Sequence, residues 1–224
     1  MERVLTGCQG ARIPVRARPA FVPLDFPALL GPEAWAKLPA AVQHRFAAHP
    51  ALGLNTVYDG RMVVEASLFG RLVAQVCRLI GTPLAPWTGA DVPTSVDVHL
   101  DPRGGLVWAR TYRFDRRSPV LVSSTKLMTA GGELLEVVRG GLGMALTVSV
   151  EDGALHFRSR RYFFSLGDLR LPIPDLLTPG RAHVVHRDVG GGRFRFTMDF
   201  HHPWFGRTLF QDGVFQDPPG RPPQ

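Results

Sequence analysis

The sequence predicts a mostly β protein with a minor helical part, in which an antiparallel sheet curls or closes on itself. From residue 92 to residue 215, apolar and polar residues alternate with a period of two, which is typical of strands with one buried face. Turn sequences recur between these runs, such as Glu-Asp-Gly at residues 151–153 and Gly-Gly-Gly at residues 190–192. Gly (24) and Pro (20) are abundant among the 224 residues without a fixed period, which favours many turns.

The two ends of the chain differ in composition from its middle. Residues 1–25 are rich in Arg and Pro, and we interpret them as a flexible arm; residues 217–224 (DPPGRPPQ) are expected to be disordered or extended. Residues 26–216 are predicted to form a single β-barrel-like domain. The N-terminus has no continuous apolar run of the kind found in signal peptides. We therefore expect a soluble, cytoplasmic protein without a transmembrane segment.

One or two helices are predicted before the strands. Residues 32–46 carry apolar side chains at intervals of three and four, and Pro39 must start, break or kink this helix. The second helix is expected to begin after the N-cap Ser67 and to end at Gly81. Its wet face is predicted to hold Arg71, Gln75 and Arg78, and it is a candidate plug for one end of a barrel. The predicted apolar stripe of this helix consists of Leu68, Leu72, Val76, Leu79 and Ile80.

The strands follow one another with no helical pattern between most of them. A sheet of about 8–10 strands tends to close, because closure removes exposed edges, and its interior is then either filled by side chains or holds one small ligand. This favours a lipocalin-like barrel. The core is expected to include the aromatic residues of the late strands, namely Phe157, Phe163, Phe194, Phe196 and Phe200.

Charge, cysteines and histidines exclude several classes of function. The net charge is +7, but the arginines are scattered, so we expect no nucleic-acid partner. A disulfide between Cys8 and Cys77 stays open, although Cys77 in an apolar helix is more simply a small buried side chain. On a strand, two pairs of histidines point to opposite faces, so we predict no metal site, and no glycine loop opens a helix to hold a cofactor. These pairs are His183 with His186 and His201 with His202.

Several short motifs follow one another along the chain: Leu-Pro at 38–39, LIGTP at 79–83, DVP at 91–93, Trp108-x-Arg110-x-x-x-Phe114, GELLE at 132–136, Asp152-Gly153-x-Leu155, LPIP at 171–174, GRFRF at 192–196 and Gly213-x-Phe215. Their order and spacing resemble the bacterial domain-of-unknown-function family 4166, over residues 30–216. The resemblance implies a compact, mostly β domain and no established activity. Such domains also appear appended to oxidoreductase domains, which implies an oxidoreductase as a partner. At residues 204–207 the family leads us to expect a more aliphatic stretch than Trp-Phe-Gly-Arg.

Arg110 is the most informative polar residue, because it shares a strand face with Trp108 and Tyr112. If that face points inward, the guanidinium needs a partner, since an unpaired buried charge is very costly. Glu136 is the candidate partner. The pair is either a structural ion pair or part of a ligand site, in which Arg110 holds a carboxylate or phosphate and Glu136, Trp108 and Tyr112 also contribute. We expect the ligand to be an apolar or amphipathic small molecule, such as an acyl or polyketide-like chain.

Two other functions stay open at this stage. Asp97 and His99 share a strand face, and an Asp beside a His can orient a general base. With Glu136, they are the candidate catalytic residues of a cofactor-free cyclase, isomerase or dehydratase on the same scaffold. Alternatively, the chain is an accessory interaction domain for an oxidoreductase.

Overall fold

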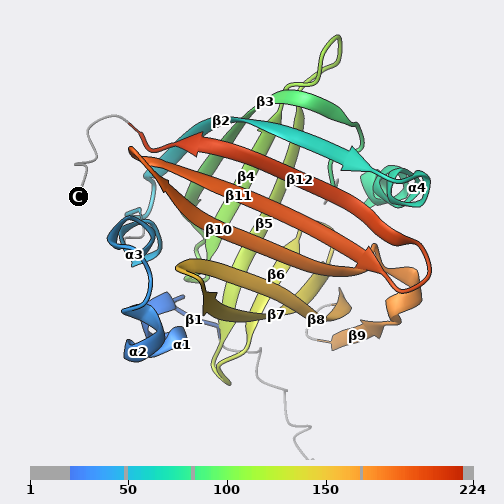
Figure 1. Cartoon of the computed structure of the whole chain (residues 1–224). Helices are drawn as coiled ribbons and strands as arrows, with labels where there is room; N and C mark the ends of the chain where they lie inside the picture. Colours follow the sequence, from blue (N-terminus) through green and yellow to red (C-terminus); the bar gives the residue numbers. More distant parts are fainter. Residues whose placement is uncertain (1–20, 48–49, 82–83, 167–168, 219–224) are drawn as a thin grey trace, which may run out of the picture.

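The computed structural model describes residues 21–47, 50–81, 84–166 and 169–218, so most of the predicted arm, Cys8 and most of the predicted tail lie outside the described residues (Figure 1). Short helices precede the barrel, and one longer helix follows its first long strand. The helices are α1 (Phe26–Leu30), α2 (Pro32–Trp35), α3 (Ala40–Ala47), α4 (Leu68–Cys77), and the 3₁₀ turns η1 (Arg78–Ile80) and η2 (Asp175–Leu177). The strands are β1 (Phe21–Val22), β2 (Asn55–Ala66), β3 (Gly89–Leu100), β4 (Leu106–Tyr112), β5 (Val120–Thr129), β6 (Leu134–Val138), β7 (Leu142–Glu151), β8 (Ala154–Leu166), β9 (Leu169–Ile173), β10 (Arg181–Gly190), β11 (Arg193–His202) and β12 (Gly206–Gln216).

Ten of these strands form a closed antiparallel barrel, which confirms the predicted fold class. Around the barrel the order is β5, β4, β3, β2, β12, β11, β10, β8, β7 and β6, and the pairing of β6 with β5 closes the ring. The first strand of the barrel thus pairs with the last, β2 with β12, so that residues 59–66, which precede the predicted run of strands, lie beside residues 209–216. β1 and β9 pair outside the ring, with β5 and β8.

The segment α1–α3 closes one end of the barrel (Figure 1). Phe26 and Phe46 point into that end and meet Phe157, with ring centroids 5.9 Å and 6.1 Å away. Both inserted rings are buried. Of the three effects expected of Pro39, the structure shows a break: residues 32–46 form two short helices, and Pro39, which cannot donate a helical hydrogen bond, lies between α2 and α3.

The helix α4 begins as predicted but is rotated relative to the expectation. The side chain of Ser67 accepts a hydrogen bond from the amide of Gly70, so it is the N-cap. The predicted packing stripe is wrong: Leu72, Val76 and Leu79 are 62%, 56% and 87% exposed. The packed face instead holds the small residues Gly70 and Ala74, and a Cβ on Gly70 would lie 2.0 Å from the carbonyl oxygen of Thr208. The close approach of α4 to β12 therefore selects small residues, and the leucines face outward.

A register shift between β7 and β8 redistributes the late aromatic residues. The pairing slips between Ala145 and Leu146, so residues beyond it change faces. Phe163 consequently packs in a separate small cluster with Leu135 and Ala145. The other four predicted aromatic residues belong to the two main core clusters: Phe157, Phe194, Phe196 and Phe200.

The described residues of the two predicted terminal segments contact the folded domain. Phe21 and Val22 pair with Thr129 and Met128 of β5. At the other end, Asp217 accepts from Arg45 of α3, with 2.7 Å between Nη2 and Oδ2. The exact limits of the predicted domain stay a prediction.

Candidate functional site

The interior of the barrel is partly hollow. A cavity of about 50 Å³ lies below α3 and is lined mainly by apolar side chains, including Phe46, Phe194 and Phe196. A second cavity of about 130 Å³ lies towards α4 and η2, where Val73 and Leu177 line it. Arg110 lines both cavities, so it stands at the boundary between them.

A chain of polar contacts runs across three neighbouring strands inside the barrel. Nη2 of Arg110 on β4 donates to Oγ of Ser124 on β5, at 3.2 Å. Oγ of Ser124 donates in turn to Oε1 of Glu136 on β6, at 2.6 Å. The ammonium of Lys126 lies 3.2 Å from Oε2 of the same carboxylate. The sheet register explains the ion pair, because Lys126 and Glu136 are direct partners across β5 and β6.

The structure therefore brings Arg110 and Glu136 into one cluster, but not into the direct ion pair that the sequence predicted. Ser124 bridges them, and Lys126 is the closer cation. Both missed residues carried a signal, since they alternate with period two between Val122 and Met128 and so share the inward face of β5. The pattern gave no reason to place a lysine inside, because lysines are almost never fully buried unless they are paired.

Electrostatics show that this cluster is short of negative charge. Burial by itself would raise the pKa of Glu136, but Lys126, Arg110 and the hydroxyl of Ser124 hold the pKa of that carboxyl below its usual range. Burial lowers the pKa of Lys126, against the opposing attraction of Glu136. The Nε atom of Arg110 is buried and has no hydrogen-bond partner among the described residues. Two basic groups thus share one carboxylate.

Trp108 and Tyr112 also point into the barrel, so the strand face that they share with Arg110 is the inward one. Trp108 lines the smaller cavity, and the Lys126 ammonium lies 4.2 Å from the centre of its ring. The indole Nε1 of Trp108 is buried without a hydrogen-bond partner among the described residues. Tyr112 is already engaged, because its hydroxyl donates to Oε1 of Gln211 at 2.7 Å, and burial raises its pKa. Of the two, Trp108 is the one with a free donor at the cavity.

Asp97 and His99 lie on the opposite side of the barrel wall. Their neighbours Val96 and Val98 line the smaller cavity, so the alternation of β3 turns Asp97 and His99 outward. Nδ1 of His99 lies 2.8 Å from Oδ1 of Asp97. The side chain of His99 is 41% exposed and that of Asp97 is 35% exposed. The other carboxylate oxygen of Asp97 accepts from Asn55. The predicted catalytic residues are therefore divided between two surfaces, with Glu136 inside.

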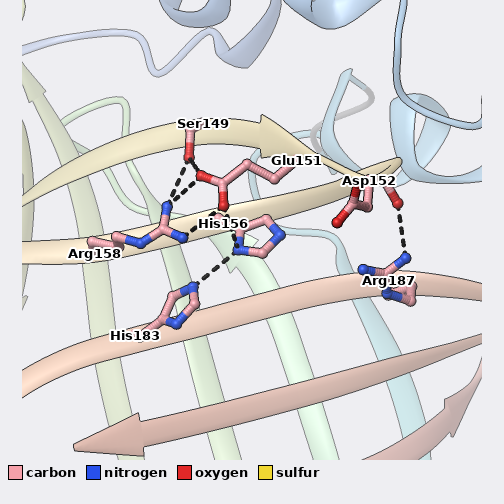
Figure 2. A network of polar contacts seen from close by, with 7 residues as sticks. All are labelled: Ser149, Glu151, Asp152, His156, Arg158, His183 and Arg187. Carbon is pink, nitrogen blue, oxygen red and sulfur yellow. Dashed lines mark hydrogen bonds and ion pairs between the residues drawn. The ribbon is translucent and has the colours of Figure 1, made fainter. Parts of the chain in front are cut away.

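A second polar network lies on the outer face of β7, β8 and β10 (Figure 2). Nδ1 of His156 lies 2.9 Å from Nε2 of His183, so one ring donates and the other accepts. Burial lowers the pKa of both rings. Beside them, hydrogen bonds from Arg158 and Ser149 lower the pKa of Glu151 to about 2. Sequence patterns could not reveal this network, because His156 and His183 are 27 residues apart and lie on different strands.

The other histidines follow the alternation expected of strands. His186 points inward and is buried, and burial together with Arg45 lowers its pKa to about 3. His202 is buried, whereas its neighbour His201 is exposed. In the described part of the chain, no three His, Cys, Asp or Glu side chains gather closely enough to hold a metal ion.

These features define a class of protein: a closed antiparallel β-barrel, capped at one end by helices, with a charged cluster between two small interior cavities. The sequence matches the model of a domain of unknown function, DUF4166, over residues 38–215, so the chain belongs to that family, as its motifs indicated. No curated protein matches the chain. Within the described residues, no helix is both long and apolar enough to cross a bilayer.

Proposed function

We propose that the barrel binds an amphipathic small molecule, such as an acyl or polyketide-like chain, whose anionic head contacts Arg110. The observation that carries this proposal is the position of Arg110, which is only 7% exposed and lines both cavities. Its Nε atom lacks a hydrogen-bond partner among the described residues. A buried donor without an acceptor costs about 1–3 kcal/mol, so this free Nε favours a ligand that supplies an acceptor over a purely structural role for Arg110.

The chemistry of the head follows from the cluster. A guanidinium presents two parallel N–H groups that match a carboxylate or a phosphate. An anion at Arg110 would also supply the second negative charge that Lys126 lacks, and it would raise the pKa of that ammonium towards its ordinary value. The proposed ligand is therefore bound as an anion.

The chemistry of the tail follows from the cavity walls. Phe194 and Phe196 line the smaller cavity, and Met198 and Phe200 line the larger one. Together the cavities are smaller than the roughly 300–1,000 Å³ of a typical ligand site. The bound chain is therefore short, or it displaces flexible side chains such as Met144 and Met198, which adapt more easily than branched ones.

Binding of a defined fatty acid tests this proposal. Titration of the purified protein with decanoate, followed by calorimetry, should show binding that Arg110→Leu weakens at least tenfold. Arg113→Leu is the matched control, because Arg113 follows the same strand but is exposed. Met198→Trp fills the larger cavity without changing the charge and should also weaken binding. Equal affinity of wild type and Arg110→Leu, with the fold verified by circular dichroism, would reject the proposal.

The enzyme alternative receives no comparable support. It requires Asp97, His99 and Glu136 to act on one substrate, and the barrel wall lies between the first two and the third. We therefore assign no catalytic role to these residues.

A further inference from the structure

The end of the barrel that lies opposite α1–α3 exposes a concentration of large apolar side chains. Eleven of the eighteen exposed large apolar residues in the described chain belong to α4, η1, β8, β9, η2 and the turn between β11 and β12. All of these elements except the start of β8 lie towards one side of the molecule, away from α1–α3 (Figure 1). Among the most exposed are Leu79 (87%), Leu177 (73%) and Trp204 (71%). We name this surface the apolar rim.

Contacts between these elements connect three parts of the apolar rim: α4, the β11–β12 turn and η2. The ring of Phe69 on α4 stacks on Phe205 in the β11–β12 turn, with 4.1 Å between centroids. His202, at the end of β11, approaches the carbonyl oxygen of Leu176 in η2 at 3.3 Å through its Nε2 atom. The turn thus joins α4 to η2, and exposed apolar side chains follow one another across all three elements.

Two elements of the apolar rim, α4 and η2, also line the larger cavity. Val73 and Cys77 on the inner side of α4 line that cavity, and so does Leu177 of η2, which is itself exposed. On α4, Leu72 and Val76 precede these two lining residues by one position each, so they form the adjacent stripe of the helix. A molecule that leaves the cavity between α4 and η2 therefore passes the apolar rim.

The charges at this end are mainly positive. The helix α4 has no acidic residue, and it carries Arg71, with Arg78 directly after it. The backbone of Arg139 lies against Gly81, so this exposed arginine stands beside the end of the same helix. Near the turn and η2, two further arginines are matched by acidic partners: Arg207 by Glu65 and Arg181 by Asp175.

We propose that the apolar rim docks on the surface of an anionic lipid membrane, from which the barrel takes up or to which it delivers its ligand. This inference rests on the proposed function for the exchange step, but the docking itself does not require a ligand. A short helix with leucines on one side and arginines beside them has the composition of an interfacial helix, which inserts its apolar side among headgroups. Trp204 suits the same position, because tryptophan prefers the boundary between lipid and water.

The charge balance favours a lipid surface over a protein as the occupant. An anionic leaflet attracts each exposed cation near it by about 1 kcal/mol. Arg71, Arg78 and Arg139 are exposed and have no acidic partner among the described residues, so they contribute to this attraction at low salt. A lipid surface also solves the transfer of an amphipathic ligand, since the apolar chain passes from the bilayer into the cavity without crossing water.

Flotation of the full-length protein with lipid vesicles tests the proposal. We expect binding to vesicles of phosphatidylcholine with 30% phosphatidylglycerol, weaker binding to phosphatidylcholine alone, and a decrease with added salt. The double variant Leu72→Glu/Leu79→Glu should lose at least tenfold in partitioning. Leu52→Glu/Leu54→Glu is the matched control, because both leucines are exposed (72% and 63%) but follow α3 at the capped end.

Two further variants separate this proposal from the proposed function. Arg71→Glu/Arg78→Glu should reduce binding to the anionic vesicles and leave binding to neutral vesicles unchanged. Arg110→Leu should bind vesicles like wild type, even where it no longer binds decanoate. The proposal is overturned if wild type does not float with anionic vesicles, or if the Leu72/Leu79 variant floats like wild type. A third result would also overturn it: wild type does not bind vesicles, sediments as a dimer, and becomes a monomer in the Leu72→Glu/Leu79→Glu variant. The apolar rim would then be an interface between copies of the chain.

Discussion

Lys126 and Glu136 face each other across β5 and β6 inside the barrel, with 3.2 Å between the ammonium and the carboxylate, and both side chains are at most 10% exposed. Removing one partner of a buried pair leaves the other charge without compensation. Losing the Glu136 carboxylate should cost more than losing the Lys126 ammonium. Arg110 lies in the same cluster, is connected to Glu136 through Ser124, and would also lose its nearby negative charge.

The first prediction concerns this pair. Glu136→Gln should lower the free energy of unfolding by about 3–5 kcal/mol, because two cations are then buried without an anion. The double variant Glu136→Gln/Lys126→Met should be more stable than Glu136→Gln alone, since one uncompensated charge is removed. Urea denaturation of Glu136→Gln, Lys126→Met and the double variant measures the coupling energy between the two residues. Purely additive losses would show that the pair does not interact.

The second prediction concerns pH and His186, which packs between the rings of Phe46 and Phe194. Burial lowers the pKa of His186 to about 3, so the folded protein resists a proton that the unfolded chain accepts near its ordinary pKa of 6.5. Its contribution to stability is complete above that ordinary pKa and is lost as the pH falls towards 3, by about 1.4 kcal/mol per pH unit.

Chemical denaturation between pH 7 and pH 4 measures this effect. Carboxylates with lowered pKa, such as Glu151, add a slope of the same sign, so the comparison must be made between variants. His186→Phe should show a shallower loss of stability with falling pH than wild type. His201→Phe is the control, because His201 is exposed, and it should keep the slope of wild type. Parallel curves for wild type and His186→Phe would contradict the prediction.

The third prediction concerns the contact of α4 with β12. Gly70→Val places side-chain atoms where the carbonyl of Thr208 already lies, so α4 must shift. We expect a loss of roughly 1–3 kcal/mol, as for overpacking in a core. Arg71→Val is the control for helix propensity, because Arg71 is exposed on the same helix. Thermal unfolding of both variants checks the difference, and equal melting temperatures would mean that α4 does not need the glycine.

The fourth prediction concerns the end of the described chain. The side chain of Arg45 is 3% exposed and is held by Asp188 and Asp217, which raise its pKa despite its burial. Truncation after Gln216 removes Asp217 and leaves Asp188 as the remaining partner. We expect a cost of about 2 kcal/mol, the value of a hydrogen bond to a charged group. Truncation after Pro218 is the control and should leave the unfolding midpoint in urea unchanged.

Much of the fold is determined by local pattern. The period of two along residues 92–215 places Trp108, Arg110 and Tyr112 on one face, and the structure turns that face inward. Ser67 is recognisable as an N-cap because its side chain accepts a hydrogen bond from the amide of Gly70, only three residues away. These features follow from the sequence because their geometry depends on the nearest neighbours in the chain.

Other features depend on segments that are distant in sequence. The leucines of α4 form the more apolar stripe, yet the helix packs through Gly70 and Ala74, because only small side chains allow its backbone to approach β12. The register shift between β7 and β8 moves Phe163 out of the main core, and no residue in its own strand signals this.

The sequence by itself determined the barrel class, the shared strand face of Trp108, Arg110 and Tyr112, and the family, because periodicity and motif order are properties of the chain. It did not determine which charges meet inside, since Lys126 becomes the partner of Glu136 only through the pairing of β5 with β6. It did not place Asp97 and His99, because alternation separates two faces without saying which one is inside. Only closure of the barrel decided which face is inside. It turned Val96 and Val98 towards the smaller cavity and placed Arg110 at the boundary between the two cavities.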